Sequence, residues 1–289
     1  MSSRLPFSVA HTCADLRTHT ASWRTDNKTI GLVPTMGALH EGHLSLIETA
    51  TRHCERIIVS IFVNPSQFAP HEDFSAYPRT LEEDIEKLKS LPVHLLYAPT
   101  TDEVYPSGFA TTIKVSGLTD DMEGAVRPHF FDGVATIVAK LFSQCQPDIA
   151  IFGEKDYQQL AMIKRLAQDM DMPIKIIGSP TIRDPDGLAL SSRNAYLTTE
   201  ERPIACELHQ TLQQIATEVR RGDDVRKSTT KGINHLHSVG FSPVDYLEVR
   251  DAETLDPLKA YTHSQPARIL VAATLGTTRL IDNIALNSQ

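Results

Sequence analysis

The sequence predicts an α/β protein, with a doubly wound parallel sheet (Rossmann-like) in the N-terminal domain and a smaller α+β C-terminal domain. Short apolar runs alternate with helical patterns along the N-terminal part, and this alternation stops at the loop RDPDGLALSSRN (183–194). A different pattern, one amphipathic helix and then strand-like runs, follows it. Because 289 residues are many for one compact domain, two unequal domains are expected, 1–187 and 188–289.

Five runs in the N-terminal part are expected to be parallel strands. Each is β-branched and almost continuously apolar, as suits a strand that helices cover on both faces. They are TIGLV (29–33), RIIVSIFV (56–63), VHLLYA (93–98), DIAIF (148–152) and PIKIIG (173–178). Proline cannot donate to a central ladder, so the first strand is expected to end at Pro34.

Helical patterns lie between these strands and in the C-terminal part. In YPRTLEEDIEKLKS, Thr80 precedes Glu83 by three residues, which predicts a capping box at the start of a charged surface helix. Two buried helix faces are expected at i, i+3, i+4 spacing: Val134, Ile137, Val138, Leu141 and Phe142, and then Leu208, Leu212, Ile215 and Val219, ending near Gly222. VDYLEV (244–249) and ARILVAATLGTTRLI (267–281) are expected strands, the second broken at Gly276 as in a hairpin.

Composition argues against several classes of protein. The formal charge of −8, from 28 basic and 36 acidic residues without a basic cluster, makes a nucleic-acid partner unexpected. The apolar runs fall short of the ~20 residues of a membrane helix, and the N-terminus lacks the apolar block of a signal peptide, so a cytoplasmic protein is expected. The four cysteines show no disulfide or metal-site spacing and are expected to be buried or idle thiols.

The stretch TMGALHEGH (35–43) follows the first predicted strand. Gly37 gives the backbone room to turn, and His40 and His43 would share one face of a helix N-terminus, where unpaired N–H groups favour anions. This predicts a phosphate cradle. With 12 histidines in the chain an H-x-x-H pair also arises by chance, so a structural role stays open. Zinc is a weaker alternative, because H-E-x-x-H and a third ligand are absent.

Two further stretches suit a nucleotide. In FGEKDYQQL (152–160), Lys155 could offer a positive charge to phosphates and Asp156 could accept hydrogen bonds from ribose; the alternative, an exposed charged helix cap, is slightly favoured by these residues alone. In LALSSRN (188–194), two serines and Arg193 suit a triphosphate, and an ordinary turn is the alternative.

A fourth stretch, FVNPSQF (62–68), carries two neutral amides. Asn64 and Gln67 could orient a polar substrate, and an Asx-turn before Pro65 is the alternative. Three of the four stretches begin where a predicted parallel strand ends, which is where such a sheet forms its ligand site. Motifs of P-loop kinases, dinucleotide dehydrogenases and serine hydrolases are absent.

Six motifs in this order, PTMGALHEGH, FVNPSQF, YPRT, EGAVRP, FGEKDYQQL and DGLALSSRN, closely resemble the pantothenate synthetase (pantoate–β-alanine ligase) family of the H-x-G-H nucleotidyltransferase superfamily. The resemblance implies a ligase of pantothenate and coenzyme A biosynthesis. It would condense (R)-pantoate with β-alanine through a pantoyl-adenylate, giving pantothenate, AMP and diphosphate. The resemblance also implies ATP as a substrate, Mg²⁺, a cytoplasmic homodimer and a C-terminal domain that acts as a lid, while charge and the short apolar runs predict no nucleic-acid or membrane partner.

The resemblance assigns site residues. The ATP-binding residues would be Met36, Gly37, Ala38, Leu39, His40, Glu41, Gly42, His43, Gly153, Glu154, Lys155, Asp156, Ile182, Leu190, Ser191, Ser192 and Arg193. Of these, His40, His43, Lys155 and Arg193 would be catalytic, with His43 in the position of the proton donor. Ile182 would contact adenine through its backbone. Gln67 and Gln159 match the glutamines that hold pantoate, with Gln67 also near β-alanine.

The chain departs from the family pattern at two places. In RPHFFDGV (127–134), His129 precedes by one position the place where the family has its histidine, which puts a role for it in doubt. Ser66 stands where a larger apolar residue is common, so a looser pantoate pocket is expected. The metal ligands stay unknown: Asp84 and nearby carboxylates are candidates, and a charged helix face explains them equally well.

Two other functions remain open. A nucleotidyltransferase of the same superfamily would stop at a nucleotide-bound product, and a nucleotide-sensing module would bind ATP without turnover. The two amide-bearing stretches favour the ligase over both.

Overall fold

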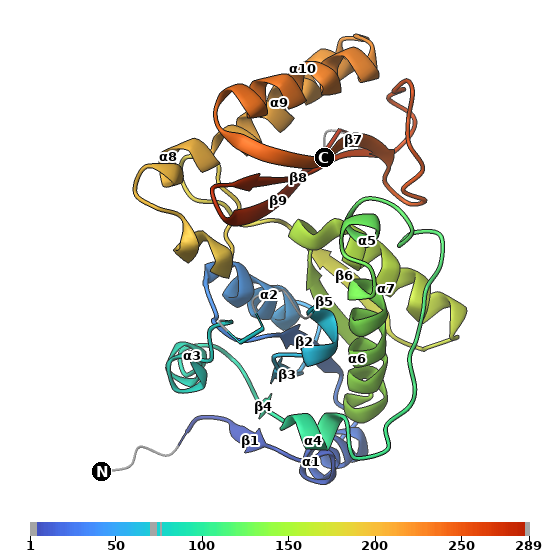
Figure 1. Ribbon diagram of the computed structural model, residues 1–289. Coiled ribbons are helices and arrows are strands. Elements are labelled where there is room, and N and C mark those ends of the chain that lie inside the picture. Colours follow the sequence, from blue (N-terminus) through green and yellow to red (C-terminus); the bar gives the residue numbers. More distant parts are fainter. Residues whose placement is uncertain (1–4, 70–73, 76, 287–289) are drawn as a thin grey trace. The chain divides into compact units, whose positions relative to one another are not determined.

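The computed structural model describes residues 5–69, 74–75 and 77–286, which divide into two compact units (Figure 1). The first unit runs to Gly117 and includes the segments 127–154 and 162–180. The second unit contains the segments 118–126 and 155–161 and the chain from Thr181 onward. Each unit is therefore assembled from three separate pieces of the chain.

A six-stranded parallel sheet forms the centre of the first unit in the described part of the chain. Its order is β1-β4-β3-β2-β5-β6. The strands are β1 (Ser8–Ala10), β2 (Ile30–Thr35), β3 (Arg56–Ile61), β4 (Leu95–Tyr97), β5 (Ile149–Gly153) and β6 (Lys175–Ser179). The five predicted strands are confirmed as β2 to β6. Strand β1 was not predicted, because three residues carry no readable periodicity.

Helices cover both faces of this sheet, with α2 on one side and α6 on the other (Figure 1). The α-helices assigned to this unit are α1 (Cys13–Thr25), α2 (Glu41–Thr51), α3 (Leu81–Leu88), α4 (Thr101–Val104), α6 (Phe130–Cys145) and the later turns of α7 (Tyr157–Asp169). Alternate strand residues, among them Val33, Val59 and Ile151, pack in one buried cluster with Leu46 and Ile47 of α2. The intervening strand residues Leu32, Ile58 and Ala150 are buried as well, and burial on both faces explains why the strands read as unbroken apolar runs.

Strand β2 continues past the residue at which it was expected to end, so that prediction was wrong. Pro34 pairs in register with Ser60 of β3, and the strand runs on to Thr35. Pairing with β5 on the other edge extends only to Leu32. Pro34 therefore lies beyond the residues of β2 that pair with β5, so its missing N–H breaks no hydrogen bond between these two strands.

The start of α3 was predicted correctly, but its capping interaction was not. Thr80 is the N-cap residue, yet its side chain makes no capping hydrogen bond. Its hydroxyl instead donates to Oδ2 of Asp84 at 3.4 Å. The helix is also not simply a charged surface helix, because Asp84 is fully buried.

The second unit contains a three-stranded antiparallel sheet, in the order β7-β8-β9, which packs against two helices. Its elements are α5 (Glu123–Val126), η3 (Ser192–Tyr196), α8 (Glu201–Ala205), α9 (Glu207–Arg220), α10 (Val225–Ser238), β7 (Phe241–Asp251), β8 (Ala267–Leu275) and β9 (Thr278–Ala285). The predicted helix α9, strand β7 and the hairpin at Gly276, where φ is +56°, are confirmed. Helix α10 was not predicted because its mixed polar sequence shows a weak apolar stripe.

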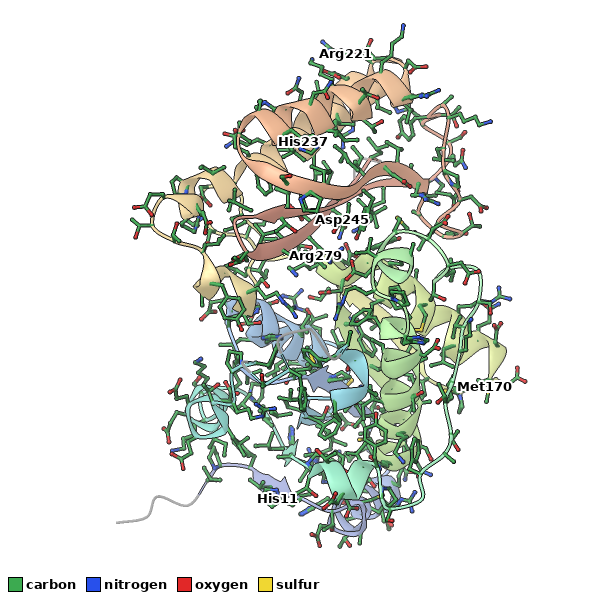
Figure 2. All side chains as sticks on the ribbon, viewed as in Figure 1. His11, Met170, Arg221, His237, Asp245 and Arg279 are labelled. Carbon is green, nitrogen blue, oxygen red and sulfur yellow. The ribbon has the colours of Figure 1, made fainter. Side chains whose placement is uncertain are left out.

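An ion-pair cluster ties the short segment 118–126 to the strands of the second unit. Figure 2 shows Arg279 next to Asp245. Nε of Arg279 lies 2.7 Å from Oδ2 of Asp245. The same guanidinium donates to both carboxylate oxygens of Glu123, at 3.0 and 2.8 Å. Because α5 is only one turn long, these bonds rather than helix propensity hold it in place.

Across the described residues, no helix has both the length and the apolar character that crossing a membrane requires. The four cysteines are free thiols, and Cys145 and Cys206 are buried. Burial raises the pKa of Cys54 to about 11, so this thiol stays protonated near neutral pH. These findings fit the expectation of idle thiols.

Candidate active site

The sheet of the first unit changes winding direction beside β2. The chain passes from β2 to β3 and β4 on one side, whereas β5 and β6 lie on the other. The carboxyl ends of β2 and β5 therefore flank a topological switch point, where open α/β sheets bind ligands. Strand β2 ends at Thr35, directly before the predicted ATP-binding segment 36–43, and β5 ends at Gly153.

The segment after β2 makes a tight turn that requires unusual backbone angles. Gly37 and Ala38 have positive φ values of 83° and 50°. A Cβ on Gly37 would lie 3.1 Å from Oδ2 of Asp84 and 3.2 Å from Cγ2 of Ile61. Glycine is therefore needed at position 37 both for its conformation and for the close approach of its neighbours.

The carboxylate of Asp84 holds this turn from helix α3. Its two oxygens accept hydrogen bonds from the backbone N–H groups of Ala38 and Leu39, at 2.9 and 2.8 Å. One turn further along α3, Lys87 donates to the carbonyl oxygen of Leu39 at 2.7 Å. The expectation that Asp84 belongs to a charged helix face was wrong. Its carboxylate is buried and anchors the loop.

His40 and His43 form the start of helix α2 together. The N–H of Gly42 donates to Nδ1 of His40 at 3.1 Å, and the N–H of His40 donates to Nδ1 of His43 at 3.4 Å. The two rings lie 4.1 Å apart at their centroids and are tilted by 37°. Because each Nδ1 accepts a backbone hydrogen, a neutral ring must carry its proton on Nε2.

This arrangement combines the two interpretations of the histidine pair. The Nδ1 atoms have a structural role as helix caps. The Nε2–H groups are hydrogen-bond donors at the positive end of a helix of 11 residues, a place that stabilises negative charge. The pair can therefore cap the helix and bind a phosphate at the same time.

The amide-bearing stretch 62–68 follows β3 and forms the single turn η1 (Pro65–Gln67). Asn64 accepts from the N–H of Ser66, as in the Asx-turn alternative, which is confirmed. Its Nδ2 also donates to Oε1 of Gln67 at 2.9 Å and to the carbonyl oxygen of Gly133 at 3.2 Å. The side chains of Asn64 and Gln67 are both buried. The stretch is therefore a turn whose two amides are held inside the protein.

The second unit holds the predicted site residues Lys155, Asp156 and Gln159. The 3-10 turn η2 (Glu154–Asp156) precedes α7. Lys155 is partly buried, its Nζ lies 3.9 Å from Oδ2 of Asp156, and its carbonyl oxygen accepts from Asn283 at 2.8 Å. Gln159 is partly exposed. Its neighbour Gln158 is buried and bonds to backbone groups of the segment 118–126, so only Gln159 suits a ligand.

The predicted phosphate-binding loop of the second unit is shaped by backbone bonds. The N–H of Leu190 donates to the carbonyl oxygen of Ile182 at 3.0 Å, and the hydroxyl of Ser191 accepts from the N–H of Arg193 at 3.3 Å. Salt bridges brace the preceding turn: Arg183 bonds both oxygens of Asp282, at 2.6 and 2.8 Å. The backbone of this stretch therefore forms a turn, as the alternative interpretation expected. The side chains of Ser191, Ser192 and Arg193 are partly exposed.

The predicted site residues are thus divided between the units. Met36 to His43, Gly153, Glu154 and Gln67 belong to the first, and Lys155, Asp156, Gln159, Ile182 and Leu190 to Arg193 belong to the second. Within the units, the structure pairs His40 with His43 and Lys155 with Asp156. The convergence of His43, Lys155 and Arg193 on one nucleotide stays a prediction.

His129, the displaced histidine, has a backbone role. Its φ is +74°, it precedes α6, and its side chain makes no capping hydrogen bond. Its carbonyl oxygen accepts from the N–H of Gly133 at 3.1 Å. Nearby, the guanidinium of Arg127 lies over the ring of Phe130, 3.9 Å from its centroid, and donates to the carbonyl oxygen of Gln67 at 3.2 Å.

Comparison with known proteins decides the family. The family model described as pantoate-beta-alanine ligase matches residues 8–285, nearly the whole chain. The chain belongs to the pantoate–β-alanine ligase family. It is therefore an enzyme of this ligase family, as the motifs predicted.

Relatives and solved structures of the family match over almost their full length. The pantothenate synthetase of Caulobacter vibrioides is 51% identical over 279 residues, covering 96% of this chain and 98% of the relative. The crystal structure of pantothenate synthetase from Thermus thermophilus superposes with a TM-score of 0.91 at 44% identity, covering 98% and 100% of the two chains. The fold class predicted from the sequence is confirmed by this match.

A third match bears on ligands. The pantoate-beta-alanine ligase of Francisella tularensis, whose crystal structure is described as a complex with beta-gamma ATP and beta-alanine, has a TM-score of 0.80 at 36% identity. The match covers 98% of this chain and 99% of the Francisella tularensis chain.

Sequence reasoning missed two features of this ligase. The anchoring role of Asp84 was missed because its hydrogen-bond partners lie 45 and 46 residues away in the chain. Tyr105, whose hydroxyl donates to Oδ1 of Asn64 at 2.8 Å, was also missed. The local signal for Asp84 is Leu88, a buried leucine one helical turn further along α3, which indicates that this side of the helix faces inward.

Proposed function

We propose that this enzyme condenses (R)-pantoate with β-alanine at the expense of ATP, through a pantoyl-adenylate, and releases pantothenate, AMP and diphosphate. The proposal is supported by the family to which the chain belongs and by the Francisella tularensis relative described as a complex with beta-gamma ATP and beta-alanine. The observation that carries it is the histidine pair at the N-terminus of α2, in which Nδ1 of each ring accepts a backbone N–H and each neutral ring carries its proton on Nε2.

Adenylation is the step that this pair suits. A carboxylate is a poor acyl donor because its leaving group would be oxide, whereas an adenylate leaves as AMP. In the first step a pantoate oxygen attacks the α-phosphorus of ATP, the bond from that phosphorus to the bridging oxygen breaks, and diphosphate leaves. Such a transfer depends on positioning and on neutralising charge rather than on a protein nucleophile.

The roles proposed for the charged residues follow from this chemistry. His40 and His43 donate hydrogen bonds from Nε2 to the phosphate oxygens, and Lys155 and Arg193 supply positive charge to the departing diphosphate. In the second step the deprotonated amine of β-alanine attacks the acyl carbon, and the bond from that carbon to the AMP oxygen breaks. No covalent bond to the enzyme forms in either step.

The remaining assignments complete the proposed site. Gly153, Glu154, Asp156 and the segment 36–43 hold the nucleotide, Ile182 contacts adenine, Leu190, Ser191 and Ser192 line the phosphate loop, and Gln67 and Gln159 hold pantoate. The C-terminal part from residue 188 is proposed to close over the site as a lid.

Mg²⁺ is proposed to enter with ATP. Among the described residues no group of three or more His, Cys, Asp or Glu could hold a metal ion. Both oxygens of Asp84 already accept backbone hydrogen bonds. These residues therefore fit an ion whose ligands are mainly phosphate oxygens and waters, as Mg²⁺ prefers. Bound in this way, Mg²⁺ would neutralise negative charge on the phosphates of ATP.

The proposal also includes a homodimer in the cytoplasm, where ATP is available. Light scattering coupled to gel filtration would test the dimer: a mass near 64 kDa, twice the 32.0 kDa of the chain, is expected. A mass near 32.0 kDa would contradict it.

An isotope experiment tests the reaction. Pantoate labelled with ¹⁸O in its carboxylate is incubated with ATP, Mg²⁺ and β-alanine, and the products are analysed by mass spectrometry. One ¹⁸O should appear in AMP for each pantothenate formed, because the attacking oxygen stays on the α-phosphorus. Label in inorganic phosphate with ADP as a product would reject the adenylate. Formation of a stable nucleotide adduct unaffected by β-alanine would favour a nucleotidyltransferase, and ATP binding without turnover would favour a sensor.

A further inference from the structure

Four polar side chains of the first unit form one hydrogen-bonded network beyond the end of β3. They are Asn64, Ser66 and Gln67 of the amide-bearing stretch and Tyr105, which follows α4. The side chain of Asn64 is almost completely buried, and Gln67 is 9% exposed. Buried amides must satisfy their donors and acceptors inside the protein, so the network determines how each amide is turned.

The backbone determines the orientation of Asn64. Its Oδ1 faces the N–H of Ser66 at 3.3 Å, and a backbone N–H can only donate. Its Nδ2 faces the carbonyl oxygen of Gly133 at 3.2 Å, and a carbonyl oxygen can only accept. Exchanging the two ends of the amide would place donor against donor and acceptor against acceptor, so this orientation is the only one that satisfies both neighbours.

The orientation of Asn64 in turn determines that of Gln67. Because Nδ2 of Asn64 is a donor, the Gln67 atom that it contacts at 2.9 Å must be the acceptor Oε1. The other end of the Gln67 amide, Nε2, therefore points away from Asn64. A ligand at Gln67 meets an NH₂ group, which can only donate.

Ser66 and Tyr105 strengthen this orientation. The hydroxyls of Ser66 and Tyr105 donate to Oδ1 of Asn64 at 2.9 and 2.8 Å, and the two hydroxyl oxygens lie 3.1 Å apart. Burial raises the pKa of Tyr105, so the phenol keeps its proton at neutral pH. The Tyr105 ring also packs against Phe109, with centroids 5.0 Å apart, which fixes the position of its hydroxyl.

We infer that Ser66 and Tyr105 are positioning residues, which hold Asn64 so that Gln67 presents its amide NH₂, and not its oxygen, to the hydroxy acid. The substrate atom at Gln67 is then a hydrogen-bond acceptor, a carboxylate or hydroxyl oxygen. This inference rests on the proposed function, because it takes pantoate as the ligand of Gln67. Without the two hydroxyls only the backbone partners of Asn64 hold the network, so the Gln67 orientation that turns its oxygen toward the substrate becomes more populated and pantoate binds less tightly.

Kinetics of hydroxyl-deletion variants test the inference. Tyr105→Phe and Ser66→Ala should each raise the KM for pantoate about threefold to tenfold, in line with one lost hydrogen bond. The double variant should raise it further, with kcat and the KM for ATP changed less than twofold. Ser66→Thr, which keeps the hydroxyl, should restore the KM for pantoate.

A matched control separates positioning from stability. In the same unit, the hydroxyl of Tyr97 donates to Oε1 of the buried Gln144 at 3.2 Å. Tyr97→Phe removes a similar phenol–amide bond elsewhere, so it should lower the unfolding midpoint by a similar amount and leave the KM for pantoate unchanged. If Tyr105→Phe, Ser66→Ala and the double variant also leave that KM unchanged, the inference is overturned.

Side-chain NMR gives a readout that does not depend on turnover. In protein labelled with [¹⁵N]glutamine, the Gln67 NH₂ signals are assigned as those lost in Gln67→Met. Saturating pantoate should shift both protons and slow their exchange with water, and the double variant should reduce this shift. Unshifted signals at saturation would overturn the inference. If calorimetry detects no pantoate binding to the unaltered enzyme, the proposed function fails instead, so the two failures are distinguishable.

Discussion

Oδ1 of Asp84 lies 2.8 Å from the backbone nitrogen of Leu39, 45 residues earlier in the chain. Through this bond and its partner to Ala38, a fully buried carboxylate on α3 determines the path of the loop that leads into the histidine pair. Two backbone N–H groups and the hydroxyl of Thr80 donate to the carboxylate of Asp84. Such carboxylates are expensive to bury, and their backbone hydrogen bonds are what makes them tolerable.

Asp84→Asn should lower stability and weaken ATP binding. The amide can accept from only one of the two N–H groups and turns its NH₂ toward the other. A buried unsatisfied donor costs about 1–3 kcal/mol, so urea unfolding should show a loss of that size. The KM for ATP should rise because the loop loses its fixed shape. Glu83→Gln on the same helix turn is exposed and should change neither quantity.

Substitution of His43 should distinguish the two ring nitrogens. A glutamine places its amide near the position of Nε2 and an asparagine places its amide near that of Nδ1. If the Nε2–H group binds phosphate, His43→Gln should retain more adenylation activity than His43→Asn, and His43→Ala should lose a factor of about 10²–10³. Rapid-quench measurement of adenylate formation checks this order.

The control for this series lies at the other end of the same helix. His53 is exposed, and its N–H bonds to the carbonyl oxygen of Ala50. His53→Ala should leave adenylation unchanged. Equal activity of the Gln and Asn variants of His43 would argue against the assigned tautomer.

Asp282 should make stability depend on pH in the acid range. Burial tends to raise the pKa of this carboxyl, but its contact with His209 and the hydrogen bonds and charge of Arg183 outweigh that effect and lower the pKa. A lowered folded-state pKa means that the stabilisation is complete above the unfolded value, about 3.9. The stabilisation from Asp282 is lost as the pH falls from the unfolded-state pKa through the lower pKa of the folded state.

Asp282→Asn should therefore remove this acid dependence. At neutral pH the variant should lose about 3 kcal/mol, because the Arg183 charge stays buried without its partner. The difference from the unaltered enzyme should shrink below about pH 4. Asp256→Asn, at an exposed position, serves as control. A constant difference between pH 7 and pH 3 would contradict the prediction.

Gly133→Ala should destabilise the enzyme, although alanine is normally preferred in a helix. A Cβ at this position would lie 2.2 Å from the carbonyl oxygen of Ser66, a backbone atom that cannot move aside alone. Overpacking of this kind costs about 1–3 kcal/mol. Chemical unfolding would measure it, and a gain of about 0.5–1 kcal/mol, as at an unobstructed helix glycine, would show that α6 and η1 have room to separate.

The sequence determined those features that arise from local periodicity and local turn chemistry. Apolar runs marked β2 to β6, helical spacing marked α6 and α9, and Gly276 marked the hairpin of β8 and β9. The ordered motifs also indicated the family, since residues such as His40 and His43 keep their spacing in the chain whatever surrounds them. Periodicity failed for β1, which is too short, and for α10, which has few apolar positions.

Tertiary structure alone decided how the site residues are held. Asp84 reads as one more charge in a charged helix, and only the packing of α3 against the loop turns it toward Ala38 and Leu39. In the same way, only the approach of Gly133 and Tyr105 shows which end of the Asn64 amide faces which partner. Hydrogen bonds between residues far apart in the chain leave no periodic trace, because they depend on where whole elements pack.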